Sequence, residues 1–468
     1  MFRGKPTRRP LTVAVLLTLL VAGVGGGLFY APPKVAAAAT TLTFLGPKFD
    51  EWEAFIKVAN EMGKDMGIEV KADYQDWEDV FKKALLDFKS GVKTWDLIYA
   101  YNTWIPAISE TKAFTPLDEF LAKPENKAMV KPEDFIKETT QGFIANGKLW
   151  AFPVLSAPYM MAYRTDLLTN AGEKQAFKAK YKYDLPSPPQ TYAQLMDIAE
   201  FFTRKKGTPV GGAPAAEDFY GICMAGKTGG FLFHRYEMFL VAFGADLVYD
   251  QKTMKPTVDS KESIAAATYF VKLHKFQQPG SEGHTGGGTQ RLFAAERCAT
   301  TVDALDNILS VAEVPDMSKI VGKVTYAPLP TQIPARPHAS VVDTNGPGIY
   351  ALSQYKYEAF KLLAKVLSTD GTKALMKEYP ALVPMRASVF NDPLVKQSYP
   401  KMVEAMNAQI AGKAWTIFTP ALKEQVQAQS MVEAALSAVL AGQATPEAAM
   451  KDAQAKVVEL FKRAGYIK

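Results

Sequence analysis

The sequence predicts an α/β protein with two lobes, each built on a sheet covered by helices. The chain has 468 residues, more than one hydrophobic core usually serves, so two domains are expected. Its composition, with 48% hydrophobic and 22% charged residues, is ordinary for a globular protein. Strand-like and helical patterns alternate within residues 41–100, which is typical of a parallel sheet.

The first 39 residues differ in composition from the rest of the chain. Basic residues, including Arg8 and Arg9, precede an apolar run over residues 11–28, and a run of alanines ends at Ala39. This pattern predicts a signal peptide over residues 1–39 that is removed after Ala39. The alternative is an uncleaved anchor, because the apolar run approaches the length that spans a bilayer. The adjacent arginines fit either a twin-arginine or an ordinary secretory signal.

The predicted signal carries most of the positive charge of the chain. Residues 1–39 contain five Lys or Arg and no acid, so removing them lowers the formal net charge from +6 to +1. A nearly neutral mature chain gives no reason to expect nucleic acid or an anionic membrane as a partner. Cys223 and Cys298 would face an oxidising compartment, where they either pair or stay free.

The folded part begins with strands expected over residues 41–45, 68–72 and 95–100, separated by helices over residues 51–62 and 77–88. In such parallel sheets, ligands gather at the carboxyl ends of the strands. We therefore expect ligand contacts from the residues that follow the first and third strands. These residues are Lys48, Asp50, Tyr101, Asn102 and Trp104.

Residues 146–172 predict a passage of the chain from one lobe to the other. Asn146 and Gly147 favour a tight turn, and the short apolar strand after them ends at Pro153, which has no N–H to donate. A second extended run follows over residues 159–163. Such a passage would put Tyr159 at the mouth of a cleft.

Helices and strands continue to alternate in the rest of the chain. Helices are expected over residues 190–204, 235–243, 263–276, 358–368 and 444–460, and strands over residues 219–224, 298–302, 323–329 and 346–352.

Several stretches resemble extracellular solute-binding proteins of bacterial ABC importers, in the carbohydrate-binding, maltose-binding-protein-like group. The stretches are GKLWAFP, AFKAKYKYDL with AEFFTR, SKIVGKVTYAPLP and PMRASVFNDP, and the resemblance runs in order from about residue 41 to the end. It implies a periplasmic binding protein-like fold, with a hinge of three chain crossings and a ligand cleft between the lobes. The implied crossings lie near residues 155–158 and 300–304 and within residues 358–370. Lobe 1 would then comprise residues 40–155 and 304–365, and lobe 2 residues 156–303 and 366–468.

The resemblance and the chain order supply the remaining candidate ligand-binding residues. Asn345 and Gly346 lie in the sequence TNGPG, where the backbone could approach a ligand closely. The crossover and the second lobe would add Tyr159, His234 or Tyr236, Asp303 and Trp415, and Arg386 resembles a family position close to the cleft. Aromatic rings suit the C–H faces of sugars, and planar polar groups suit their hydroxyls. The balance of Lys48 and Arg386 against Asp50 and Asp303 favours a neutral ligand.

Patterns that would indicate an enzyme are weak in this sequence. Residues 221–228, GICMAGKT, match a phosphate-binding loop, but their apolar interior is typical of a buried strand and two glycines interrupt the helix that must follow. The four histidines lack metal-ligand spacing, and GxSxG does not occur. We therefore expect a binding protein without cofactor or metal. An exported carbohydrate-active enzyme is the alternative, and two carboxylates facing each other across the cleft would favour it.

The function implied is that of a periplasmic or extracytoplasmic monomer that captures a small solute, expected to be a carbohydrate or polyol. Closure of the lobes would present the solute to the transmembrane permease of an ABC importer. The alternative within this class is a charged or amphipathic solute, such as a phosphorylated polyol, a polyamine or a quaternary amine.

Overall fold

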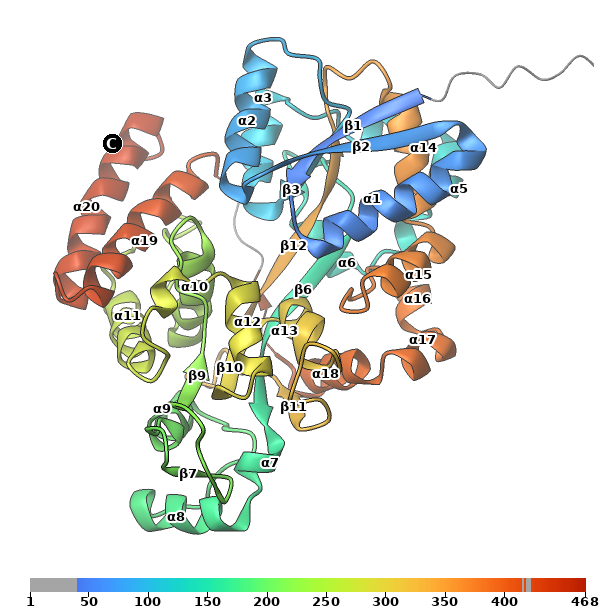
Figure 1. Ribbon diagram of the computed structural model, residues 1–468. Helices are drawn as coiled ribbons and strands as arrows, with labels where there is room; N and C mark the ends of the chain where they lie inside the picture. Colours follow the sequence, from blue (N-terminus) through green and yellow to red (C-terminus); the bar gives the residue numbers. More distant parts are fainter. Residues whose placement is uncertain (1–39, 415, 418–421) are drawn as a thin grey trace, which may run out of the picture. The chain divides into compact units, whose positions relative to one another are not determined.

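One mixed sheet runs through both lobes of the protein. The computed structural model describes residues 40–414, 416–417 and 422–468, and its nine-stranded sheet has the order β2-β1-β3-β12-β6-β10-β9, with β11 beside β6 and β13 beside β12 (Figure 1). The strands are β1 (Thr40–Pro47), β2 (Ile68–Gln75), β3 (Leu97–Tyr101), β6 (Leu155–Arg164), β9 (Tyr220–Cys223), β10 (Cys298–Ala304), β11 (Val324–Ala327), β12 (Ser340–Ile349) and β13 (Thr416–Ile417). Two short hairpins pair β4 (Ile144–Ala145) with β5 (Lys148–Leu149) and β7 (Pro209–Val210) with β8 (Ala213–Pro214).

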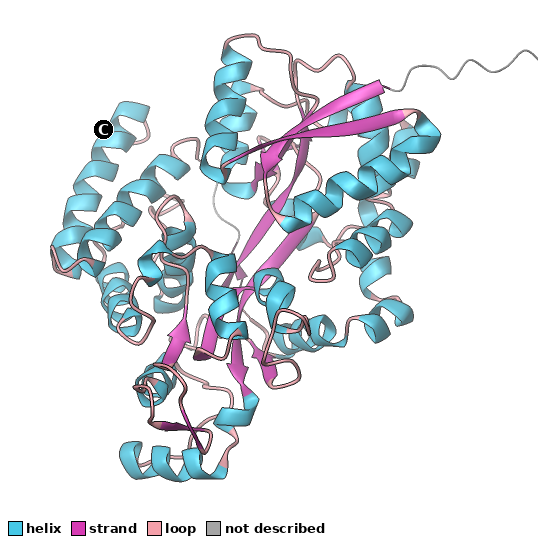
Figure 2. Cartoon of the chain, in the orientation of Figure 1, coloured by secondary structure: helices cyan, strands magenta, loops and turns pink. Residues whose placement is uncertain are grey.

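Helices surround the strands of both lobes (Figure 2). Those that precede β6 are α1 (Asp50–Gly63), α2 (Trp77–Lys89), α3 (Ile105–Thr111), α4 (Asp118–Leu121), α5 (Pro124–Val130) and α6 (Lys137–Gln141). Those between β6 and β12 are α7 (Thr165–Leu168), α8 (Ala171–Tyr181), α9 (Tyr192–Phe202), α10 (Phe231–Phe243), α11 (Lys261–His274), α12 (Gly286–Ala294) and α13 (Leu305–Ala312). The last are α14 (Lys356–Val366), α15 (Thr369–Glu378), α16 (Ala387–Phe390), α17 (Pro393–Ser398), α18 (Pro400–Ala411), α19 (Gln425–Leu440) and α20 (Pro446–Ala464).

The first lobe forms the predicted parallel α/β arrangement. β1 pairs in parallel with β2 and with β3, and α1 and α2 connect them. Helix α1 carries acidic residues in its first turn, where the positive end of the helix dipole stabilises them. It buries Trp52 and Phe55 on one face. The Trp52 ring stacks on Phe44 of β1, with centroids 5.5 Å apart. Apolar spacing in the sequence therefore predicts both elements, and the structure adds the contact between them.

β6 and β12 are the strands that connect the lobes. The first residues of β6, Leu155–Pro158, pair with β12, and the following residues up to Tyr163 pair with β10. The last residues of β12, from Asn345, pair with β3. Each strand thus pairs with first-lobe strands at one end and with second-lobe strands at the other. This arrangement confirms the two-lobed α/β fold.

The course of the chain differs from the predicted one after β10. β11 pairs with the second-lobe end of β6, so the chain stays with second-lobe elements beyond residue 304 and returns only along β12. Later, α15 packs against α1 and α14, and the chain reaches second-lobe elements where α18 contacts β11. The predicted crossings near residues 300–304 and within residues 358–370 are therefore displaced. The reason is that an apolar strand has the same local pattern in either lobe.

The GICMAGKT segment does not form a phosphate-binding loop. Its first half lies in the buried strand β9, and α10 begins only at Phe231. The carboxylate of Glu433, on α19, accepts hydrogen bonds from the backbone N–H groups of Gly229 at 2.8 Å, Gly230 at 3.0 Å and Phe233 at 3.3 Å. An internal carboxylate therefore occupies the anion position at the N-terminus of α10.

Cys223 and Cys298 form a disulfide between the neighbouring parallel strands β9 and β10, with Cα atoms 5.9 Å apart. This settles the alternative that the sequence left open. Among the described helices, none combines the length and the apolar character needed to cross a membrane. The predicted signal peptide lies outside the described residues.

Candidate functional site

A cavity of about 290 Å³ lies among the ends of β1, β3 and β12, the start of α10 and the first turns of α12 and α13. First-lobe and connecting elements contribute residues 48–51, Trp77, Tyr99, Tyr101, Leu155, Asp343, Asn345 and Tyr379 to its lining. Second-lobe elements contribute Phe231, His234, Arg235, residues 285–287, Arg291, Ala304, Asp306, Asn307, Ser310, Val311 and Met317.

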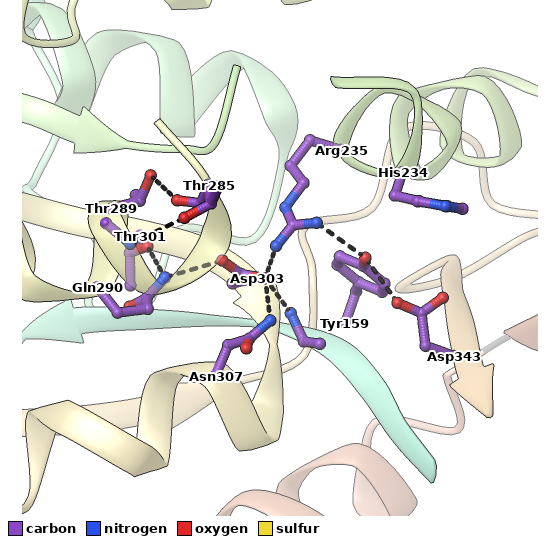
Figure 3. Close-up of polar contacts among 12 residues, drawn as sticks. Tyr159, His234, Arg235, Thr285, Thr289, Gln290, Thr301, Asp303, Asn307 and Asp343 are labelled. Atoms are coloured by element: carbon purple, nitrogen blue, oxygen red, sulfur yellow. Dashed lines mark hydrogen bonds and ion pairs between the residues drawn. The ribbon is translucent and has the colours of Figure 1, made fainter. Parts of the chain in front are cut away.

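A chain of polar contacts runs along the wall of the cavity, and its links from Asp343 through Tyr159 and Arg235 to Asp303 are drawn in Figure 3. Tyr101 donates to Asp343 Oδ1 at 2.5 Å, and Tyr159 donates to Asp343 Oδ2 at 2.8 Å. Arg235 donates to the Tyr159 hydroxyl at 3.3 Å and forms an ion pair with Asp303. Burial holds the pKa of both phenols well above its ordinary value, so both stay protonated and donate to Asp343.

Asp303 is fixed at the end of β10 by several donors in addition to Arg235. Its Oδ1 accepts from the Ala304 backbone N–H at 2.8 Å and from Asn307 Nδ2 at 3.1 Å, and its Oδ2 accepts from Gln290 Nε2 at 3.1 Å. The carboxylate is fully buried. It therefore compensates the Arg235 charge, and that guanidinium is not a free cation for a ligand.

Within the part of the chain that the structure describes, the residues that could hold a metal ion are His234, Glu237 and Asp343, whose potential ligand atoms lie within 4.8 Å of one another. His234 Nδ1 lies 2.9 Å from Glu237 Oε1, and the two phenols occupy both oxygens of Asp343. An ion would have to displace these contacts. Burial alone would lower the pKa of His234, but Glu237 and Asp343 outweigh it and raise that pKa, which favours an imidazolium between two carboxylates.

Two further carboxyl groups line the cavity from opposite lobes. Glu51 is in the first turn of α1 and Asp306 in the first turn of α13. Burial raises the pKa of Glu51 to about 8, and the charge of Asp306 adds to this shift. Burial also raises the pKa of Asp306 to about 7, together with the charges of Asp303 and Asp343. These two groups repel each other because both are acidic and neither is compensated.

The tryptophan among the described lining residues is Trp77, which the sequence places in a helix without a site role. Its ring centroid lies 5.5 Å from that of Tyr101, 5.9 Å from that of Phe231 and 6.1 Å from that of His234. Trp104 is one of the two tryptophans expected in the site, but its side chain is 2% exposed and stacks on Phe81 at 5.1 Å. The pocket role of Trp104 is therefore wrong, because the ring turns inward to the first-lobe core.

The other predicted residues fall into three groups. Lys48, Asp50, Tyr101, His234 and Asn345 line the cavity. Tyr159 and Asp303 lie behind the lining, in the polar chain described above. Trp415 lies outside the described residues.

Four more predicted residues do not line the cavity. Tyr236 is fully buried and donates to the Ser263 carbonyl at 2.9 Å. Asn102 is 3% exposed and does not line the cavity. Gly346 does mark a close approach, but to protein backbone, since a Cβ there would lie 1.8 Å from the Phe152 carbonyl oxygen. These corrections share one cause: a side chain near the end of a strand or helix can be buried in the protein core and need not face the cavity.

Arg386 is the fourth, and it belongs to the first-lobe framework. Its guanidinium donates to the Val130 carbonyl at 2.7 Å and lies 3.2 Å from Asp134, and its side chain is 2% exposed. It therefore does not balance the acids of the cavity, and the predicted neutral charge balance loses one of its two bases.

Sequence reasoning missed Glu51, Trp77, Arg235, Asp306 and Asp343. Two of them carried a signal. Asp343 interrupts the apolar sequence SVVDTNGPGI, and Arg235 lies in the apolar helix FLFHRYEMFLVAF. Charged groups in such surroundings need partners or a function. Glu51 and Asp306 had no such signal, because acids are common in the first turn of any helix.

Comparison with known proteins connects this geometry to a family. The model of the family described as bacterial extracellular solute-binding protein matches residues 46–373. A probable amino-acid ABC transporter periplasmic-binding protein of Sinorhizobium fredii is 22% identical over 464 residues, covering 95% of this chain and 96% of that protein.

Solved structures share the fold. An ABC transporter solute-binding protein from Agrobacterium radiobacter K84, in complex with ribitol, has a TM-score of 0.77 and 23% identity, covering 90% of this chain and 99% of the other. A solute-binding protein from Agrobacterium vitis S4 with bound D-mannitol has a TM-score of 0.76 and 24% identity, covering 92% of this chain and 100% of the other. A maltose-bound protein from T. maritima has a TM-score of 0.73 and 22% identity, covering 90% of this chain and 100% of the other.

Proposed function

Because this chain belongs to the bacterial extracellular solute-binding protein family, we propose that it captures a small carbohydrate or polyol and delivers it to the permease of an ABC importer. One observation carries this proposal: a cavity is lined by side chains from both lobes, next to the two strands that connect the lobes. The ligands of the similar solved structures, ribitol, D-mannitol and maltose, support the solute class.

The chemistry of the lining suits a polyhydroxylated ligand. The Trp77 ring offers an apolar face to C–H groups, and Asp306 and Asn345 each have a buried side-chain oxygen without a partner among the described residues. Hydroxyl groups can donate to those oxygens. Since each oxygen without a partner costs free energy, a ligand that satisfies them gains affinity when the lobes close over it.

We propose the following division of the chain for this closure. Lobe 1 comprises residues 40–157 and 343–390, and lobe 2 comprises residues 158–342 and 391–468, which revises the division expected from sequence. β6 and β12 act as the hinge, because each extends into both lobes. The ligand would favour the closed form by contacting both lobes.

The remaining parts of the proposal concern the setting of the protein. We place it outside the cytoplasmic membrane as a monomer, exported by the signal peptide at residues 1–39. It acts by binding alone, without catalysis, cofactor or resident metal. Its macromolecular partner is the transmembrane permease.

A thermal-shift screen of the purified protein tests the proposal. We expect at least one compound among ribitol, D-mannitol, D-tagatose, maltose and related sugars to raise the melting temperature, since ligand at 100 times its Kd adds about 2.7 kcal/mol to stability. Isothermal titration calorimetry would then give the stoichiometry. The absence of any shift across mono-, di- and oligosaccharides and polyols would refute the carbohydrate assignment. Turnover of a glycoside, with loss of turnover in Glu51→Gln, would instead support a hydrolase.

A further inference from the structure

The cavity contains two acidic groups that the protein does not neutralise. Glu51 and Asp306 both line it, and the described residues place no cation within 4 Å of either carboxyl group. Asp306 is 6% exposed, and its Oδ1 has no hydrogen-bond partner among the described residues. A buried, unpaired carboxylate is costly, so the raised pKa values of the two groups keep protons on this pair near neutral pH, and a bound cation can replace those protons.

The basic residues of the lining do not supply such a cation. His234 lies 2.9 Å from Glu237 Oε1 and is held by that carboxylate. Arg235 is paired with the buried Asp303. The Lys48 side chain is 72% exposed and lies 4.0 Å from Glu53, so it belongs to the rim. Arg291 also lines the cavity, but it is exposed and makes no ion pair with either acid.

The helix N-termini reduce this negative charge but do not cancel it. Glu51 and Asp306 lie in the first turns of α1 and α13. A helix N-terminus carries a partial charge of roughly +0.5, whereas each carboxylate carries a full negative charge. About one negative charge therefore remains for the pair when both groups are ionised. Hydroxyl donors would satisfy the oxygens with hydrogen bonds, but they would not offset this charge, so the pair would keep its protons in a closed, low-dielectric cavity.

We propose that the ligand is an amino sugar or an amino polyol, with a protonated amine bound between Glu51 and Asp306. This inference rests on the proposed function and narrows its solute class. The ammonium donates to one carboxylate from each lobe, so it links the lobes directly, while the hydroxyls of the ligand donate to Asn345 and face Trp77. A neutral sugar of the same shape makes only the second set of contacts.

The test is calorimetric titration of the purified protein with matched pairs of compounds. The pairs are D-glucosamine with D-glucose, D-galactosamine with D-galactose, and 1-amino-1-deoxy-D-sorbitol with D-sorbitol, and putrescine serves as a cation without hydroxyls. We expect the amine of at least one pair to bind at least tenfold more tightly than its neutral partner. Asp306→Asn and Glu51→Gln should each remove most of that preference. The matched controls Asp316→Asn and Glu61→Gln, both exposed acids near the same helices, should retain it.

The outcomes separate this inference from the proposed function. If neutral sugars bind as tightly as their amines, the inference is wrong and the carbohydrate function stands. If putrescine alone binds, the two acids hold a cation that carries no hydroxyls, and both the inference and the carbohydrate function are wrong. If no compound of the panel binds, the inference is wrong, and the thermal-shift screen decides the carbohydrate function. Because Asp306→Asn could alter folding, its melting temperature and circular dichroism spectrum are recorded first, and Glu51→Gln gives an independent measurement.

Discussion

Gly230 is a position where one methyl group should weaken ligand binding without touching the ligand. It precedes α10 and lies against Trp77 of α2, on the other lobe. A Cβ at Gly230 would lie 2.8 Å from Trp77 Cζ3 and 3.1 Å from Cη2. The Trp77 ring cannot easily retreat, because its centroid is 5.4 Å from that of Trp104 and 5.5 Å from that of Tyr101. Alanine at Gly230 therefore opposes the approach of the two lobes.

The magnitude follows from the overlap. Forcing one extra carbon into a packed contact typically costs about 1–3 kcal/mol. That cost applies only when α10 and α2 are in contact, so it reduces the closed form and weakens ligand affinity by roughly 5- to 150-fold. A second cost of about 1–2 kcal/mol arises from the positive φ of 104° at Gly230, but it is present whether the lobes are open or closed.

Gly212→Ala is the control for that second cost. Gly212 has a similar φ of 94°, and a Cβ there meets nothing within 4 Å. Both variants should lose a comparable amount of thermal stability, whereas only Gly230→Ala should lose affinity in calorimetric titration with a sugar or amine that binds the parent. If the two variants bind this compound within twofold of each other, the contact between α10 and α2 does not take part in closure and the reasoning is refuted.

Three further predictions follow from the same structure. Trp77→Ala should weaken ligand binding by about 2 kcal/mol or more in calorimetric titration, because this ring lines the cavity. Trp104→Ala should instead lower the free energy of unfolding by about 3–5 kcal/mol in urea denaturation, because this ring is buried. The reverse pattern would contradict the assignment of the two rings. The pKa of Asp306 is raised to about 7 from its ordinary value near 3.8, so the folded state holds a proton that the unfolded state releases, and stability falls as pH rises from about 4 to 7. Asp306→Asn should therefore raise the melting temperature more at pH 8 than at pH 5. An equal rise at both pH values would contradict the raised pKa. Glu433→Ala should destabilise the protein by about 2 kcal/mol, because one buried and two half-buried backbone donors lose their acceptor, and it should confer no ATP binding. Unchanged stability in thermal denaturation would show that water replaces the carboxylate.

The fold class and much of the local structure could be predicted from the amino-acid sequence. The alternation of strands and helices in the first lobe, the family resemblance and the apolar face of α1 were all readable from spacing and composition. Local capping also follows the sequence: Thr191 and Gln194 form a capping box at the start of α9. These features depend on residues close in the chain, whose geometry is nearly the same in any fold.

Only the tertiary structure decided which side chains form the cavity. Trp77 and Trp104 are equally apolar and both lie near strand or helix ends, yet one lines the cavity and the other enters the core. Sequence could not show that Glu51 meets Asp306, which is 255 residues away, or that Arg386 is bound within the first lobe. Strand order was equally hidden, since β11 pairs with β6 through backbone groups that every sequence possesses. The direction of a side chain and the partner of a strand depend on packing between distant segments, and no local pattern records that packing.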